Sequence, residues 1–263
     1  MDETPDHELR PSRAARRHRH AGRRIGGGCP VIDWLFTPID PGRAHDLSVA
    51  VKYHARVMVI AWGILVPVGV IAARFFKVLP RQRYPEVVDN RAWWRAHLTA
   101  QIGALILTVV GMWLILTRPE VTSSLTATSW LHRSLGWAVL WLGIMQGASG
   151  AFRGSRGGPG DPRGSMRGDH YDMTPRRLAF EAMHKVSGYA ALILSMGAVL
   201  TGLWQTNAPH WMWIVLPLWW GLMGTLFWLF QKRGMVIDTY AAIWGPDAIH
   251  PGNARRRPPE AGE

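Results

Sequence analysis

The sequence predicts an all-α integral membrane protein with five transmembrane helices, four of them forming a core bundle and one lying at its edge. Three observations predict this class. Five long apolar runs occur in the chain of 263 residues, lysine and arginine gather between the runs, and a histidine stands at the start of each of the first four. Aromatic residues make up 10% of the chain and charged residues only 18%, which is a high aromatic load and a low charged fraction for a soluble domain.

The five apolar runs are long enough to cross a bilayer as helices, because about 20 residues span about 30 Å of hydrocarbon. The predicted spans are residues 57–73, 98–117, 134–152, 186–205 and 211–230, and none of them contains Asp, Glu, Lys or Arg. They lack the alternation of β-barrel strands. Pro67 and Pro217 are expected to kink or loosen the first and fifth helices, which membrane bundles tolerate.

The basic residues predict which ends of the spans face the cytoplasm. Six Lys or Arg residues lie in 74–95, seven in 153–185 and five after residue 230, against two between the second and third spans and none between the fourth and fifth. The positive-inside rule therefore places the first three segments, and the C-terminus, in the cytoplasm. The same asymmetry explains the net charge of +12, so no nucleic-acid partner is expected.

Composition divides the chain into three regions. Residues 1–44 are predicted to be a basic, largely disordered N-terminal region, residues 45–232 the transmembrane domain, and residues 233–263 a cytoplasmic tail. The N-terminal region lacks the apolar core and cleavage site of a signal peptide. The single cysteine, Cys29, excludes an intramolecular disulfide and the C-x-x-C-H attachment of covalent haem.

Four histidines stand within about one turn of the start of successive spans: His54, His97, His132 and His184. Consecutive spans run antiparallel, so the first and third spans start at one membrane face and the second and fourth at the other. His54 and His132 are therefore expected on the outer side, and His97 and His184 on the cytoplasmic side. Each face receives two imidazoles from two different helices.

Two imidazoles per face suit a haem iron better than another metal. Zinc or copper sites usually add Cys, Asp or Glu ligands, and the spans contain none of these. A haem with both axial positions filled by histidine has no open site for oxygen, so it only changes its oxidation state. One such haem near each face predicts electron transfer across the bilayer. For a single interfacial histidine, a polar anchor is the alternative.

The residues around the histidines agree with this interpretation. "HRSLGW" at 132 and "HKVSGY" at 184 share one frame with an offset of 52 residues. Gly136 and Gly188 lie one turn inside the histidines, where they either leave room for a flat cofactor or serve helix packing. Arg133 and Lys185 are candidates for pairing with haem propionates, with snorkelling to lipid headgroups as the alternative.

These motifs resemble the cytochrome b561 family over roughly residues 45–232. The similar segments are "HARVMVIAWGILVPVGVIAARFFK" at 54, "RAHLTAQIGALILTVVGMWL" at 95, "LHRSLGWAVLWLGIMQGASG" at 131 and "HKVSGYAALILSMGAVLTGLW" at 184. The chain is similar to bacterial stand-alone forms and to the domain associated with ferric-reductase and DOMON modules. The resemblance implies two non-covalent b-type haems, ligated by the first with the third histidine and the second with the fourth.

The resemblance also implies an electron donor on the cytoplasmic side and an acceptor, such as ferric iron, outside. Ascorbate is often the donor, held by basic residues after the first core helix, which here are Arg74, Lys77 and Arg81. His170 and Tyr171 are further candidates for donor contact, with a loop that caps the bundle as the alternative. The chain departs from the usual six-helix form, because "CPVIDWLFTPIDP" is too short and polar to span a membrane.

Three functions follow from these observations. The favoured one is a di-haem electron carrier or reductase in a bacterial inner membrane, with ascorbate or quinol as donor, lipid as its surroundings and a homodimer as a possible assembly. The second is a haem-bearing anchor subunit of a larger quinol-linked complex. The third is a haem-free transporter with histidines as proton relays, which the uncharged spans and the lack of inverted repeats with broken helices disfavour.

Overall fold

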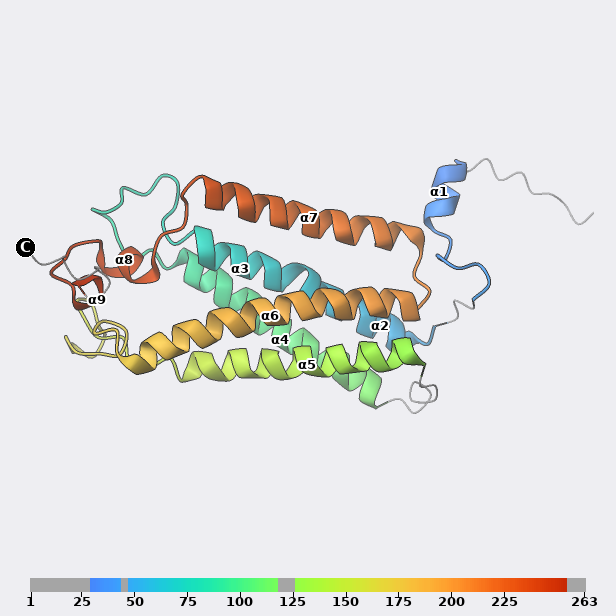
Figure 1. Ribbon diagram of the computed structural model, residues 1–263, viewed down its shortest axis with the longest axis horizontal. Coiled ribbons are helices and arrows are strands. Elements are labelled where there is room, and N and C mark those ends of the chain that lie inside the picture. Colours follow the sequence, from blue (N-terminus) through green and yellow to red (C-terminus); the bar gives the residue numbers. More distant parts are fainter. Residues whose placement is uncertain (1–28, 44–46, 118–125, 255–263) are drawn as a thin grey trace, which may run out of the picture.

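The computed structural model describes residues 29–43, 47–117 and 126–254, and Figure 1 shows their long helices running side by side. The prediction of an all-α protein is confirmed for these residues, which are helical or irregular apart from one isolated bridge between Pro38 and Pro209. The long helices are α2 (Val49–Met58), η2 (Val59–Leu65), α3 (Val66–Phe75), α4 (Ala92–Leu116), α5 (Ala127–Ala151), α6 (Pro175–Gln205) and α7 (His210–Lys232). The short ones are α1 (Pro30–Leu35), α8 (Thr239–Trp244) and α9 (Pro251–Ala254).

Four helical rods are long and apolar enough to cross a membrane. They are the continuous α2–η2–α3 rod (Val49–Phe75), α4, α6 and α7. The predicted span at 134–152 lies within α5 and the residue after it. With 25 residues α5 is long enough to cross a membrane, but its most apolar stretch is less apolar than those of the four rods. Gln146 accounts for part of this difference, because its amide is strongly hydrophilic. Length and composition thus support four of the five predicted spans.

The bundle core is made of small and branched residues, which allow close helix contact, and one tryptophan. α5 packs along α6, and the α2–η2–α3 rod packs along α4. The buried residues of the core come from four rods: Ala61, Trp62, Val66, Ala104, Val139 and Ala191. α7 packs against α3 and lies outside the other rods in Figure 1, at the edge of the bundle.

Pro67 changes the helix around it, as its position in the first span predicts. Proline has no N–H, so the carbonyl of Gly63 cannot receive the usual bond from residue 67. The rod is π-helical over Val59–Leu65, just before this point. The indole Nε1 of Trp219 on α7 donates to the Gly63 carbonyl at 2.8 Å. The loosened part of the rod is therefore one of the places where α7 is bonded to the bundle.

The bundle has an α1 end and an α8 end, each near the short helix of that name (Figure 1). At the α8 end, the α5–α6 segment and the chain after α7 fold against each other. Tyr171, Met173, Tyr240 and Trp244 form a buried cluster, and the Tyr240 hydroxyl donates to the Tyr171 carbonyl at 2.9 Å. The chain after α7 therefore folds back on the bundle, where the Ala242 carbonyl also accepts from the Asp89 N–H.

Parts of the predicted terminal regions lie outside the described residues. These are residues 1–28 and 44 of the basic N-terminal region and residues 255–263 of the C-terminal tail. Residues 45–46 and 118–125 also lie outside the described ranges.

Candidate functional site

The structure brings the four histidines together as two facing pairs at opposite ends of the bundle. At the α1 end, the ring centroids of His54 and His132 are 6.3 Å apart, with an angle of 84° between the ring planes. At the α8 end, the centroids of His97 and His184 are 6.4 Å apart, with an angle of 72°. Each pair takes one imidazole from the α2–η2–α3 and α4 side of the bundle and one from the α5 and α6 side.

The spacing of each pair fits a metal ion held between two ring nitrogens. A metal–imidazole bond is about 2.0–2.1 Å long and the ring nitrogen lies roughly 1.1 Å from its centroid, which together place two such centroids about 6.2–6.4 Å apart. Both observed centroid distances, 6.3 Å and 6.4 Å, match this geometry. In the described residues no group of three or more His, Cys, Asp or Glu side chains forms an alternative site.

The first two histidines are oriented by backbone carbonyls of a neighbouring helix. His54 Nδ1 donates to the Gly111 carbonyl at 2.8 Å, and His97 Nδ1 donates to the Gly69 carbonyl at 3.1 Å. A carbonyl can only accept, so the proton resides on Nδ1 and Nε2 keeps its lone pair. This arrangement is typical of histidines that bind a metal through Nε2.

The π-helical segment explains how two unequal spacings give equivalent contacts. His54 and Gly69 are 15 residues apart on the first rod, whereas His97 and Gly111 are 14 residues apart on α4. A π-helical turn holds one residue more than an α-helical turn. The segment Val59–Leu65 therefore takes up the extra residue, and the two antiparallel rods bind each other's histidine in the same way.

The other two histidines use positions that the 52-residue repeat relates. His132 Nδ1 lies 3.0 Å from the Ala198 carbonyl and 3.3 Å from Thr201 Oγ1. His184 Nδ1 lies 3.1 Å from Ser149 Oγ, which is 52 residues before Thr201. The Ser149 hydroxyl donates its own proton to the carbonyl of Gln146, so it accepts from His184. All four imidazoles thus leave Nε2 available.

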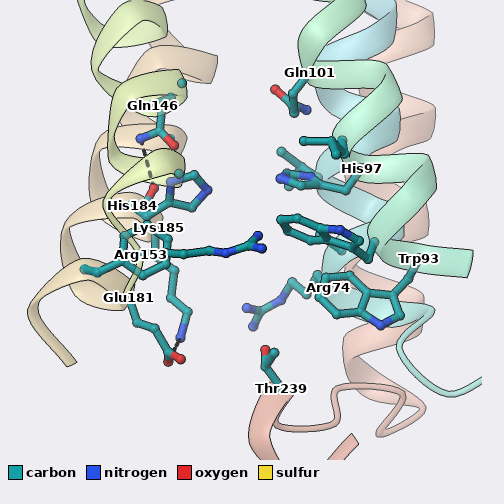
Figure 2. Close-up of a pocket in the computed structure, with 18 of the residues that line it drawn as sticks. Arg74, Trp93, His97, Gln101, Gln146, Arg153, Glu181, His184, Lys185 and Thr239 are labelled. Atoms are coloured by element: carbon teal, nitrogen blue, oxygen red, sulfur yellow. Dashed lines mark hydrogen bonds and ion pairs between the residues drawn. The ribbon is translucent and has the colours of Figure 1, made fainter. Parts of the chain in front are cut away.

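A cavity of about 980 Å³ lies between His97 and His184, at the upper end of the range for cofactor pockets, about 300–1,000 Å³. Figure 2 shows the two imidazoles on opposite walls. Apolar residues such as Trp62, Val66 and Leu105 line the interior, whereas the rim is basic. The basic residues that line it are Arg74, Lys77, Arg91, Arg153, Arg156, Arg177 and Lys185. An apolar interior with a cationic rim fits a flat apolar macrocycle that carries carboxylates.

The glycines distinguish helix packing from clearance for a cofactor. A methyl group added at Gly143 or Gly147 would lie 3.2 Å from the Leu105 side chain, so these two glycines serve helix packing. At Gly136 and Gly150 an added methyl group would meet no atom within 4 Å. Packing does not require glycine there, and Gly150 lines the cavity beside His184. This favours clearance at Gly136 and Gly150.

The two propionate candidates lie beside their histidines at opposite ends. Lys185 is at the rim of the cavity, with Nζ 3.4 Å from Glu181 Oε2 and 62% of its side chain exposed. Arg133 follows His132 on α5 at the α1 end. Sequence reasoning missed Arg153, whose guanidinium extends into the cavity and lies 4.6 Å from the Trp94 ring centroid (Figure 2). Arg153 is the first basic residue after the third predicted span.

Two of the three basic donor candidates line the cavity. Arg74 donates to Gln231 Oε1 at 2.8 Å, and Lys77 donates to the Ile237 carbonyl at 2.9 Å. Burial lowers the pKa of Lys77 to about 8, partly offset by the carboxylate of Asp238 and reinforced by nearby cations. Arg81 is exposed and does not line the cavity.

The two candidates in the α5–α6 segment lie in different surroundings. His170 is 8% exposed, lines the cavity, and its Nε2 lies 3.1 Å from a terminal nitrogen of Arg177. Tyr171 belongs to the buried cluster that caps the bundle at the α8 end, and its hydroxyl lies 3.2 Å from His250 Nδ1. His170 can therefore contact a molecule in the cavity, whereas Tyr171 stabilises the cap.

The chain is thus a helical membrane protein. Its bundle carries one pair of facing histidines at each end. The chain is similar to several curated proteins. It is 28% identical over 166 residues to the putative ferric-chelate reductase 1 of Xenopus laevis and 28% identical over 169 residues to ferric-chelate reductase 1 of Bos taurus. It is 24% identical over 160 residues to a cytochrome b561, DM13 and DOMON domain-containing protein of Arabidopsis thaliana.

These relatives support a cytochrome b561-like family, and with the four apolar helices they indicate an integral membrane protein. The alignments cover 60% to 63% of this chain but only 15% to 24% of the relatives, so the chain spans about a quarter of their length or less. No family model matches the chain. No solved structure matches it either.

Proposed function

We propose that this chain carries electrons across a membrane through two b-type haems, from a donor on the cytoplasmic side to an acceptor outside. The observation that supports this most is the pair of facing imidazole couples, 6.3 Å and 6.4 Å between centroids, at opposite ends of one bundle. In this proposal α5 is the fifth transmembrane helix, and the C-terminus is cytoplasmic.

The chain's own residues would hold and orient each haem. His54 and His132 would hold the haem at the α1 end, and His97 and His184 would hold the haem at the α8 end. Bound haem supplies a one-electron couple at each site. The Nδ1 bonds fix the ring orientations before the cofactor binds, and the basic rim of the cavity neutralises the propionates at the α8 end.

A buried tryptophan, Trp62, lies in the apolar core between the two sites. His97 bonds to Gly69, which lies 15 residues after His54 on the α2–η2–α3 rod. At about 1.5 Å per residue, the two histidine pairs are therefore roughly 20 Å apart along this rod. Trp62 lies near the middle, is 6% exposed, and donates from Nε1 to Thr108 Oγ1 at 2.9 Å. In this proposal Trp62 places a polarisable ring between the two haems.

The direction of transfer is inferred from the cavity at the α8 end. Its rim carries Arg74, Lys77 and Arg153, and the positive-inside rule places this end in the cytoplasm. An anionic or hydrogen-bonding reductant, ascorbate or quinol, fits this rim. The names of the Xenopus and Bos relatives support ferric iron as an outside acceptor for this chain.

A second candidate is a haem-bearing anchor that passes quinol electrons to a soluble partner. The Arabidopsis relative favours it, since its name combines cytochrome b561 with DM13 and DOMON domains in one protein. Co-purification of a redox-active soluble subunit that is reduced by quinol through this chain would support the anchor over a stand-alone carrier.

Spectroscopy of the purified full chain, expressed with ample haem supply, tests the proposal. We expect a sharp low-spin b-type band in the reduced-minus-oxidised spectrum and about two haems per chain. In sealed vesicles, a donor at the α8 end should reduce ferricyanide on the opposite side. A colourless preparation, or one haem per chain that needs no histidine from the second pair, would contradict the proposal.

A further inference from the structure

One surface outside the haem sites is not used by the electron-transfer function. Helix α1 and the residue after it expose four large apolar side chains within six consecutive residues: Val31 (62%), Ile32 (55%), Trp34 (48%) and Phe36 (68%). α1 has no buried residue. Figure 1 shows it crosswise to α7, beyond the point where α7 begins. Apolar surface of this density requires a partner other than water.

The chain after α1 is bonded to the turn between α6 and α7, which fixes the height of α1 along the bundle. The Asn207 side chain is fully buried; its amide donates to the carbonyls of Asp40 and Arg43, and its oxygen accepts from the Asp40 N–H. Arg43 donates to the Trp204 carbonyl at 2.9 Å. These bonds also satisfy carbonyls at the end of α6.

α1 itself contacts the first residue of α7. The rings of Trp34 and His210 are 4.2 Å apart between centroids, and His210 Nδ1 donates to the Thr37 carbonyl at 2.9 Å. α6 ends at Gln205 and α7 begins at His210, and both helices are apolar enough to span a membrane. α1 therefore lies at the level where two spans end, which is the boundary between hydrocarbon and headgroups.

We propose that α1 is an interfacial anchor that lies in the membrane plane, with its apolar side chains in the boundary between headgroups and acyl chains. α7, which α1 contacts, also exposes apolar side chains: Val215 and Leu218 are 50% and 68% exposed. A helix of six residues is too short to span, but an apolar segment with tryptophan is typical of this boundary. The sequence prediction that this segment does not span agrees with such a role.

The only cysteine of the chain provides a direct test. Cys29 is exposed and is the residue immediately before α1, so a nitroxide spin label attached to it reports the position of α1 without any mutation. In vesicles of phosphatidylcholine and phosphatidylglycerol, we expect oxygen to reach the label more readily than a water-soluble nickel chelate does. Two reference variants calibrate the scale. They are Cys29→Ser with Ser165→Cys in an exposed loop, and Cys29→Ser with Leu218→Cys on the exposed face of α7.

The label on Cys29 should give an oxygen-to-nickel ratio between those of the two references. Replacing Ile32 and Phe36 by Asp should shift the ratio toward the loop reference, whereas Asp33→Asn should leave it unchanged. A ratio in the native chain equal to that of the Ser165→Cys reference would overturn the proposal. So would spin–spin broadening that disappears when labelled chains are diluted with unlabelled ones, because it would assign α1 to a contact between two copies. Neither outcome depends on the haem content.

Discussion

Gly202 offers a test of the α1-end site that can be worked out from interatomic distances. A methyl group added at Gly202 would lie 3.0 Å from His132 Cε1 and 3.4 Å from His132 Nδ1. Carbon atoms prefer separations of about 3.5–4.0 Å, so the imidazole must withdraw by about 0.5–1 Å. Such a shift would stretch the 3.0 Å bond from Nδ1 to the Ala198 carbonyl to about 3.5 Å, the limit of a hydrogen bond.

We therefore expect Gly202→Ala to weaken haem binding at the α1 end by about 10- to 100-fold, as loss of a supporting bond does at other metal sites. The assay is haem per chain and the reduced-minus-oxidised spectrum after dilution or competition with a haem acceptor. The haem at the α8 end should remain and so report that the fold is intact. Alanine is also the better helix former by about 1 kcal/mol, so helix propensity does not explain a loss.

Two matched glycines complete this test. Gly224→Ala on α7, where an added methyl group meets no atom within 4 Å, should leave both haems unaffected. Gly150→Ala, at the position related to Gly202 by the 52-residue offset, should affect only the haem at the α8 end, because Gly150 lines that cavity. If Gly202→Ala retained both haems with native affinity, the proposed clash with the His132 ligand would be refuted.

Three further predictions concern the electron path and the donor site. Trp62→Leu should slow electron transfer between the two ends, measured by stopped-flow reduction in vesicles, with both haem bands retained and Trp62→Phe closer to native. Lys77 is charged below its pKa of about 8 and neutral above it, so reduction by an anionic donor should slow between about pH 7 and pH 9. Lys77→Gln should remove this pH dependence, and a slope that persists would refute the role of Lys77. Arg81→Gln should leave reduction at the native rate, because Arg81 does not line the cavity.

The sequence is sufficient to predict the helices and the grouping of the histidines, because both follow from long-range regularities. Apolar runs of about 20 residues leave few alternatives to a membrane helix. Antiparallel succession then decides which histidines share an end, and the structure places His54 with His132 and His97 with His184. Pro67 is similarly informative, since a missing N–H has a local consequence in any helix.

The partners of the imidazoles could not be predicted in the same way. The carbonyls of Gly69, Gly111 and Ala198 carry no side-chain signal, and their positions depend on the rotation of each helix about its axis. The π-helical segment that aligns Gly69 is likewise a result of packing rather than of residue preference. Ser149 is the exception, because the 52-residue offset relates it to Thr201, and this regularity is visible in the amino-acid sequence alone.

The fifth span shows where composition and packing differ. Residues 134–152 are predicted to cross the membrane because they carry no charge, yet the most apolar stretch of α5 is less apolar than those of the other four rods. Gln146 accounts for part of this, and in the structure its amide donates to the carbonyl of His184 at 3.0 Å. Gln146 therefore faces α6 rather than lipid. The mean hydropathy of α5 counts this residue as if it faced lipid, so it understates how apolar the remaining surface of the helix is.

Haem stoichiometry in two double variants tests the central claim most directly. His54→Ala with His132→Ala removes both ligands of one site, so the account predicts that one haem per chain remains. His54→Ala with His97→Ala removes one ligand from each site, so the account predicts that both haems are lost or become high-spin. One intact low-spin haem in the second double variant would contradict the pairing and with it the proposed electron path.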